Sequence, residues 1–389
     1  MKSWPFFSYF FTYILRAKTR QRLLFIAVLG LFISSFSLLV IQGIMGGLQK
    51  GLIERSKSVH GEHVLRFHEI TSESLDGIKE KLQKAGLRYY SEIEIEVMLK
   101  KKNFIAPAKI HGIELDDDIP QFLAEKDFAG MIMANELASK IQLKFMEEFQ
   151  MIVPGVTDSL MGEIPRFGTT ELSDFIYTEI PEVDEFESWT RISFVRNLLR
   201  KKGINQLRIF GDVPASLKKS IMETPTEVPF DWMTWEKMNG ALVWSLNLET
   251  KVMLFLFVSM TFLVAIAITS GFLIFFSKIQ RDLMSFWILG MGQKKIIQLT
   301  FKFTLLLSGL TVFLGGIFGI VTLKLLERYG HDLMPDIFVE RQLPVDLTIS
   351  NICLSLLIPF VISFIFSWFS FAAFRKENQS FVQIVRSLS

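Results

Sequence analysis

The run LLFIAVLGLFISSFSLLVI, from Leu23 to Ile41, decides the fold of this chain. It carries no charge and is long enough to cross a bilayer as a helix, for which about 20 apolar residues suffice. Three further uncharged runs follow it, at Val252 to Ser277, Phe303 to Leu323 and Ile349 to Phe374. A charge at the centre of such a helix would cost roughly 2.5 to 3.5 kcal/mol. The sequence therefore predicts four transmembrane helices, the first of which stays as an anchor because no signal-peptide cleavage site follows it.

The four helices divide the chain into membrane and solvent-exposed segments. Although 50% of the residues are hydrophobic, 21% are charged, which is typical of a membrane protein with a large polar domain. In order, we expect a cytoplasmic or interfacial helix (1–22), a first span with an outward extension (23–55), an outer α+β domain (56–248), a second span (249–277), a cytoplasmic helix (278–298), a third span (299–326), a short outer loop (327–348), a fourth span (349–374) and a cytoplasmic tail (375–389).

The orientation follows from the distribution of basic residues. The segment 50–249 carries 25 Lys and Arg against 33 Asp and Glu, whereas the rest of the chain carries 17 against 7. The basic excess lies in the short flanks of the apolar runs, and such flanks face the cytoplasm. We therefore predict that both termini are cytoplasmic and that the segments 50–249 and 326–348 face outward. The basic residues form no patch interleaved with aromatic residues, which argues against nucleic acid binding.

The outer domain shows mixed strand and helix patterns. They predict an α+β body into which residues 118–187 are inserted as a subdomain. The predicted elements are a strand at 63–69, a helix at 72–86, a hairpin at 88–114 that turns at 101–103, an amphipathic helix at 188–203, a strand at 204–212 and a second helix at 214–223.

No catalytic motif stands out, and we expect neither a catalytic residue nor a metal site on this chain. GMGQKK at 290–295 lacks the spacing of a phosphate-binding loop. His60, His63 and His68 cluster at the start of the outer domain, but alternation along a strand places His63 and His68 on opposite faces, so we interpret them as surface residues. The single cysteine, Cys353, excludes an intrachain disulfide.

Small residues recur at four-residue spacing in two places. Gly43, Gly47 and Gly51 form one row, and Gly315 and Gly319 form another. Such rows allow two helix backbones to approach closely. The partner of each row is either a helix of this chain or a helix of another subunit.

The segment KIQRDLMSFWILGMGQKK, at 278–295, has the pattern of a short amphipathic helix that lies on the cytoplasmic membrane surface and ends at its first glycine. Ile279, Leu283, Phe286 and Trp287 share one face. An apolar face opposite a polar face of mixed charge favours docking of a cytoplasmic protein over anchoring in lipid.

Five stretches of the sequence also carry a family pattern. They are IMGGLQKGL (44–52), NELASKI (135–141), MIVPGVTDSLMGEIPR (151–166), WEKMNGALVWSLNLETKVM (235–253) and KIQRDLMSFWILGMGQKKI (278–296). Through them, and over nearly its whole length, the chain resembles the permease subunits of the lipoprotein-releasing ABC transporter, LolC and LolE, within the wider MacB/FtsX-type permeases.

The resemblance implies a type VII ABC permease in the bacterial inner membrane, with four transmembrane helices and a large periplasmic α+β domain. Such a permease extracts lipoproteins from the outer leaflet and hands them to a LolA-like periplasmic carrier. It is not an enzyme and holds no cofactor, because a separate LolD-like ATPase dimer binds ATP and Mg²⁺ and drives it by mechanotransmission. A second permease copy or a paralogue, and membrane lipids, are the other implied partners.

The resemblance further implies three groups of site residues. Residues that line a lipid-accepting cavity are Ile44, Met45, Leu48 and Leu52. Residues of a carrier-binding loop are Pro154, Met161, Gly162, Ile164 and Pro165. Residues that couple to the ATPase are Lys278, Arg281, Asp282, Phe286, Trp287 and Gly290.

Two alternatives belong to other functional classes. One is a MacB-like efflux permease for small amphiphiles, although the ATPase of such permeases is usually fused to the chain. The other is an FtsX-like transmembrane signal transducer, although the outer domain of such proteins is usually much smaller.

Overall fold

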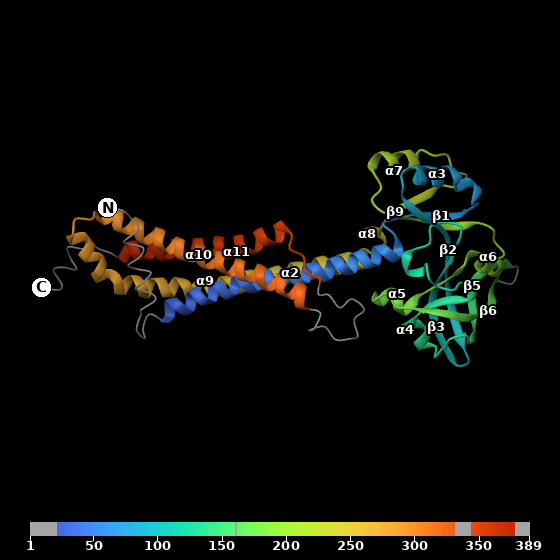
Figure 1. Ribbon diagram of the computed structural model, residues 1–389, viewed down its shortest axis with the longest axis horizontal. Helices are drawn as coiled ribbons and strands as arrows, with labels where there is room; N and C mark the ends of the chain where they lie inside the picture. Colours follow the sequence, from blue (N-terminus) through green and yellow to red (C-terminus); the bar gives the residue numbers. More distant parts are fainter. Residues whose placement is uncertain (1–21, 160–161, 331–343, 378–389) are drawn as a thin grey trace. The chain divides into compact units, whose positions relative to one another are not determined.

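A computed structural model describes residues 22–159, 162–330 and 344–377 (Figure 1). The chain forms two compact units. The membrane unit comprises residues up to Lys50 and from Ser245 onward, and the sheet unit comprises Gly51–Trp244. Parts of three expected segments lie outside the described residues: 1–21 of the N-terminal helix (1–22), 331–343 of the outer loop (327–348) and 378–389 of the tail (375–389).

Within the described residues, four helices are long and apolar enough to cross a membrane, as the four uncharged runs predicted. They are α2 (Arg22–His60), α9 (Gly240–Ile288), α10 (Gln293–Tyr329) and α11 (Ile349–Glu377). Helix α2 extends well past the first apolar run and ends at His60.

Helix α9 differs from the expectation at both ends. It begins at Gly240, before the expected start of the second span at 249, and it continues through Ser277 to Ile288 without a break. Residues 278–288 are therefore the carboxyl end of α9 and not a separate helix, because neither proline nor glycine interrupts them. Figure 1 shows that α9 curves near this end. The helix stops where Gly290 takes a left-handed φ of 92°.

The row formed by Gly315 and Gly319 packs within the chain. A Cβ atom on Gly315 would lie 2.8 Å from the carbonyl oxygen of Phe32, and one on Gly319 would lie 2.9 Å from a methyl group of Leu39. Both contacts are on α2, so the glycines of α10 let these two helices approach closely. A second subunit is not needed to explain this row.

Gly43 and Gly47 contact the stretch that precedes α11. The backbone N–H of Asp346 donates to the carbonyl oxygen of Gly43 at 2.9 Å. A Cβ atom on Gly47 would overlap the carbonyl group of Pro344. The stretch 344–348 therefore lies directly on the α2 backbone, and only glycine fits at position 47.

The described residues of the sheet unit form one sheet of nine strands in the order β3-β7-β4-β6-β5-β2-β8-β1-β9, with an additional pairing of β3 with β2 (Figure 1). That pairing closes six strands into a ring. The strands are β1 (His63–Ile70), β2 (Arg88–Lys101), β3 (Phe104–Ile113), β4 (Met131–Ala134), β5 (Glu148–Ser159), β6 (Gly162–Ile176), β7 (Glu187–Arg191), β8 (Ile204–Phe210) and β9 (Phe230–Thr234). Strand β2 is long because its amino half pairs with β8 and its carboxyl half pairs with β5.

The helices of the sheet unit are short. The helices are α3 (Asp76–Lys84), α4 (Asn135–Lys140), α5 (Pro181–Phe186), α6 (Ile192–Leu199), α7 (Ala215–Met222) and α8 (Trp235–Met238), and 3-10 turns lie at Glu73–Leu75 and Gln121–Leu123.

Two expectations for this unit were wrong. Residues 118–187 do not form a separate subdomain, because β5 pairs with β2 and thereby joins the same sheet. The predicted helix at 188–203 begins only at Ile192, because the preceding residues form β7, which pairs in parallel with β3. The other predicted elements of this unit agree with the structure within a few residues. They are strands β1 and β8, the hairpin β2–β3, and helices α3 and α7.

Candidate functional site

The four residues expected to contact lipid lie along one stripe of α2. Ile44, Leu48 and Leu52 repeat at four-residue spacing, and Met45 lies beside Ile44. The Leu48 side chain is 38% exposed, and the other three side chains are half-buried. The stripe is thus apolar and accessible over part of its surface.

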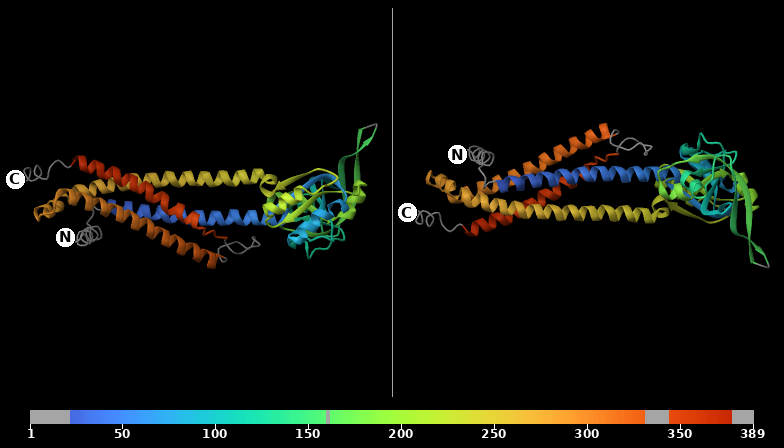
Figure 2. Two further views of the ribbon diagram at one scale, coloured as in Figure 1. Left: turned by 90° about the horizontal axis from the view of Figure 1, so that it is seen from above. Right: turned by 90° about the horizontal axis from the view of Figure 1, so that it is seen from below.

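Residues 154–159 and 162–165 belong to two paired strands, where the sequence predicted a loop. Strands β5 and β6 remain paired as far as Ser159 and Gly162. The hairpin, which we call the arm, projects from the rest of the sheet unit (Figure 2). Pro154 lies where the register of the pairing shifts, because proline has no N–H to donate to the ladder.

The residues expected to bind a carrier are distributed over this arm. Beyond the register shift, no other strand in the described part of the chain pairs with either edge of the arm. Its edges are therefore free to pair with another chain. Pro154 and Pro165 are exposed, Gly162 and Ile164 belong to β6, and Met161 lies outside the described residues.

The segment expected to couple to an ATPase forms the end of α9 and the turn after it. Ile288 and Leu289 are each 73% exposed, and Phe286 is half-buried. The N–H of Met291 donates to the carbonyl of Phe286 at 3.1 Å, which closes the helix end around Gly290. The side chains of Lys278, Arg281, Asp282 and Trp287 lie outside the described part of the structure.

A cluster of buried charges in the sheet unit is a further candidate site, and the sequence did not predict it. Its members come from five elements that converge at the carboxyl end of α2. We call it the charge cluster, and it consists of His60 (α2), Glu92 and Glu94 (β2), His111 (β3), Glu187 (β7) and Arg208 (β8).

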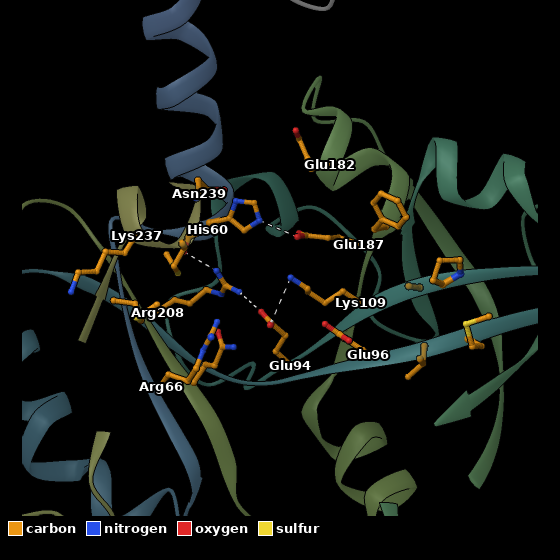
Figure 3. A pocket seen from close by; sticks show the side chains of 18 of the residues that line it. His60, Arg66, Glu94, Glu96, Lys109, Glu182, Glu187, Arg208, Lys237 and Asn239 are labelled. Carbon is orange, nitrogen blue, oxygen red and sulfur yellow. Dashed lines mark hydrogen bonds and ion pairs between the residues drawn. The ribbon is translucent and has the colours of Figure 1, made fainter. Parts of the chain in front are cut away.

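Arg208 is the centre of the charge cluster. Its guanidinium donates to Glu92 through Nε and to Glu94 through Nη2, the latter at 2.9 Å. Its Nη1 donates to the backbone carbonyl of His60 at 2.8 Å (Figure 3). Arg208 is 2% exposed and Glu92 is fully buried. The guanidinium therefore joins strand β2 to the last residue of α2.

The two imidazoles connect the remaining carboxylates. Nδ1 of His111 lies 3.1 Å from Oε2 of Glu92, and its Nε2 lies 3.5 Å from Oε2 of Glu187. Nε2 of His60 lies 3.0 Å from Oε1 of the same Glu187 (Figure 3). Trp189 stacks on the His111 ring with centroids 5.5 Å apart. Glu187 is thus held between two histidines that come from different elements.

The cluster keeps Glu92, His111 and Glu187 ionised despite their burial. Burial alone would raise the pKa of Glu92, but Arg208 and His111 outweigh it and lower that pKa to about 2. Burial would lower the pKa of His111, yet the carboxylates of Glu92 and Glu187 raise it to about 9. Burial also opposes ionisation of Glu187, but His60 and His111 hold its pKa well below the ordinary carboxyl value.

Glu92, Glu94 and His111 place one ligand atom each within 4.8 Å of one another, which is the spacing of a metal site. The guanidinium of Arg208 already supplies a cation to both carboxylates. In addition, an imidazole whose pKa is about 9 is protonated near neutral pH and has no lone pair to offer a metal. We therefore interpret the cluster as an ion-pair network.

The three histidines noted in the sequence do not converge. His60 belongs to α2 and pairs with Glu187, so its interpretation as a surface-strand residue was wrong. His63 accepts a hydrogen bond from the indole N–H of Trp232 at 3.2 Å, and burial lowers its pKa. His68 is exposed on β1.

A cavity of about 630 Å³ opens beside the charge cluster (Figure 3). Its lining carries charges of both signs together with apolar side chains of β2, β3 and β9. Gln206 lines it and is 3% exposed, and its Oε1 has no hydrogen-bond partner among the described residues. The charged residues of the lining outside the cluster are Arg66, Glu96, Lys109, Glu182 and Lys237.

Comparisons with known proteins add little to these observations. No protein-family model matches the chain, and no curated protein matches it. Among solved structures, the extracellular domain of the noncanonic ABC-type transporter YknZ from Gram-positive bacteria aligns with 44% of this chain and 98% of its own length. The identity is 10% and the TM-score is 0.29. A function for this chain must therefore be argued from its own residues.

Proposed function

We propose that the chain is the permease subunit of an ABC transporter that extracts lipoproteins from the outer leaflet of the inner membrane and passes them to a periplasmic carrier. The observation that carries the proposal is the architecture: four apolar helices, with the sheet unit inserted between the first and the second. The five family-like stretches support it: they lie within α2, on α4, in the arm, at the start of α9 and at its end.

The physical task explains why α2 matters. Moving an acyl chain of ~15 CH₂ groups into water costs roughly 12 kcal/mol, at about 0.8 kcal/mol for each group. Lipid chains must therefore move along apolar protein. The accessible stripe of Ile44, Met45, Leu48 and Leu52 on α2 supplies such a surface, and the flexible side chain of Met45 suits irregular cargo.

The energy source is a separate ATPase dimer on the cytoplasmic side. Helix α9 runs unbroken from Gly240 to Ile288, so a push at its cytoplasmic end travels along helix and not through a loop. The exposed Ile288 and Leu289 offer an apolar tip for docking. We propose Lys278, Arg281, Asp282, Phe286, Trp287 and Gly290 as the docking residues.

The arm is the proposed site for the carrier. Its free strand edges allow a partner to add a strand, and main-chain hydrogen bonds would then supply affinity. We propose Pro154, Met161, Gly162, Ile164 and Pro165 as the contact residues.

Site-specific photocrosslinking tests the proposal. The crosslinker is placed at Met45 or Leu48 in a complex with ATPase and carrier that releases lipoprotein from proteoliposomes. We expect both positions to capture lipidated cargo, and a crosslinker at Phe318, which is 56% exposed on α10, to capture less. An active complex in which neither α2 position captures lipidated cargo would overturn the proposal.

A pull-down from the native membrane separates the alternatives. Capture of a soluble lipid carrier supports the proposal, and its loss on deletion of residues 155–164 assigns the carrier to the arm. Capture of a cell-wall hydrolase that is indifferent to the deletion supports the FtsX-like transducer. Efflux of small amphiphiles without any carrier supports the MacB-like permease.

A further inference from the structure

The last turns of α2 belong to the sheet unit, and their side chains are built into it. The Ser56 hydroxyl accepts a hydrogen bond from the indole N–H of Trp235 at 2.9 Å, and both residues are buried. One turn later, His60 binds Glu187 at 3.0 Å. Ser56 and His60 share one face of the helix because they are four residues apart. This face is therefore fixed to α8 and to β7.

The two flanks of this face are also held, by Arg55 and Lys57, which lie about 100° to either side of Ser56 around the helix axis. Arg55 forms an ion pair with Glu179, which lies just before α5. Lys57 lies over the Trp235 ring, with Nζ 5.7 Å from the ring centroid. Side chains that point in different directions around the helix axis thus contact the sheet unit, so rotation of the helix end breaks contacts whichever way it turns.

The backbone leaves α2 and enters β1 without a flexible loop. Gly61 takes a left-handed φ of 77°, and a Cβ atom there would lie 2.9 Å from the carbonyl oxygen of Ile209. The N–H of Glu62 donates to that same carbonyl at 3.1 Å. The Glu62 carboxylate accepts the N–H of Gly211 at 2.7 Å. Helix and strand are therefore joined through two residues: the N–H of Gly61 donates to the carbonyl of Lys57 in α2 at 2.8 Å, and Glu62 is hydrogen-bonded to the β8 segment.

The charge cluster closes this connection electrostatically. The final carbonyl groups of a helix carry partial negative charge and lack partners within the helix. Arg208 fills that role for His60, and the guanidinium is itself held by Glu92 and Glu94. Both carboxylates lie on β2, which pairs with both β8 and β5. The helix end is thus tied to this strand.

We propose that the charge cluster and the Ser56–Trp235 hydrogen bond form a rigid joint that holds the last turns of α2, from Gly51 onward, in one orientation against the sheet. Apolar side chains of similar volume would fill this space at a lower desolvation cost. Directional ion pairs, in contrast, select one orientation of the helix end. The geometry of the joint does not depend on the proposed function; only its use in lipoprotein release rests on that proposal.

Distance measurements on the full-length chain test the joint. Cys353 is replaced by serine, and spin labels are attached at Ser58→Cys, near the end of α2, and at Thr169→Cys, on β6; both positions are exposed. We expect a narrow distance distribution in lipid nanodiscs. Glu187→Gln should broaden it at least twofold. The matched control is Glu80→Gln, which removes the exposed ion pair with Lys84 on α3 and should change nothing.

Two substitutions at His60 distinguish loss of the fixed orientation of the helix end from a general loss of stability. His60→Gln keeps a donor for Glu187, whereas His60→Phe fills the space without one. We expect the distribution to be broad for His60→Phe and close to the parent for His60→Gln. A label pair at Thr169 and Glu96, both on the sheet, reports whether the sheet is intact. If the distance distributions of Glu187→Gln and His60→Phe keep the parent's width while the sheet is intact, the proposal of a rigid joint is overturned.

The two proposals fail in different ways. If the joint is correct and the chain releases lipoproteins, His60→Phe should leave ATP hydrolysis by the partner within twofold while release falls at least tenfold. If the widths respond as expected but the parent releases nothing, the proposed function fails and the joint stands. If the parent releases lipoprotein and the widths do not respond, the joint alone fails.

Discussion

Nε1 of Trp235 lies 2.9 Å from the hydroxyl oxygen of Ser56, although 179 residues separate them in the chain. Trp235 follows β9 and precedes α9, whereas Ser56 lies near the end of α2. The relationship therefore joins the two ends of the sheet unit to each other. It also gives a structural role to the tryptophan that opens the family-like stretch at 235–253.

Replacing Trp235 by phenylalanine should destabilise the sheet unit. The buried Ser56 hydroxyl loses its donor and keeps only the contact of 3.5 Å with Nδ1 of His60, and a poorly satisfied buried polar group costs about 1 to 3 kcal/mol. The variant Ser56→Ala in the same background should recover part of that loss, because no orphaned hydroxyl remains. Hydrogen exchange of β9 amides in the full-length chain measures the effect, and strictly additive losses would contradict it.

Stability of the sheet unit should depend on pH in two windows. The pKa of Glu92 is lowered to about 2, so its contribution is complete above its ordinary value of 4.5 and is lost as the pH falls toward 2. The pKa of His111 is raised to about 9, so its contribution is complete below 6.5 and is lost as the pH rises through 9. Each contribution is on the order of 3 kcal/mol.

Hydrogen exchange of β2 and β3 amides at pH 5.5 and pH 9.5, corrected for intrinsic rates, checks the alkaline window. Protection should be greater at pH 5.5. The variant His111→Gln should remove most of this difference because it carries no titrating group. A pH dependence that is the same in both proteins would show that His111 is not its source.

Gly47→Ala should destabilise the membrane unit. The new methyl group would overlap the carbonyl of Pro344, and such overpacking typically costs about 1 to 3 kcal/mol. Thermal unfolding in detergent should therefore begin several degrees lower. Gly240→Ala is the matched control, because a Cβ atom there meets nothing within 4 Å. Equal unfolding temperatures for the two variants would refute the close packing of 344–348 on α2.

Shortening the arm should abolish carrier binding without unfolding the sheet. Deletion of residues 155–164 with a two-residue turn inserted removes no hydrogen bonds between the arm and other strands of the described chain. Circular dichroism and hydrogen exchange of β2 should therefore match the parent. Mutation of the exposed β2–β3 turn at Lys102 serves as the control for surface change, and loss of carrier capture there as well would contradict a specific role of the arm.

The membrane helices could be predicted from sequence because each requirement is local. A run without charges must be long enough to cross the bilayer, and the four runs from Leu23 onward met that condition. The hairpin of β2 and β3 could be predicted for the same reason, since its turn at Lys102 lies between two alternating segments.

The sheet order and the charge cluster depend on contacts between distant residues. Nothing local in SWTRISFVRN shows that Trp189 pairs opposite His111 on β3, so its helical pattern dominated the prediction. In SEIEIEV, acidic residues occupy alternate positions of the predicted hairpin, and no local pattern shows that two of them lie in a buried cluster. The cation that offsets the desolvation cost of burying Glu92 is Arg208, which lies 116 residues further along the chain.

Strand β1 has both of its neighbours, β8 and β9, far later in the chain, with His63 opposite Ile209 on one side and Thr234 on the other. During synthesis, β1 emerges long before either partner. One edge stays open until translation passes Phe210, the end of β8, and the other until it passes Thr234, the end of β9. Nascent chains that stop earlier would expose unpaired strand edges, which makes them targets for aggregation and proteolysis. Pairing of β1 on both edges thus requires that the whole insertion between the first two apolar helices has been made.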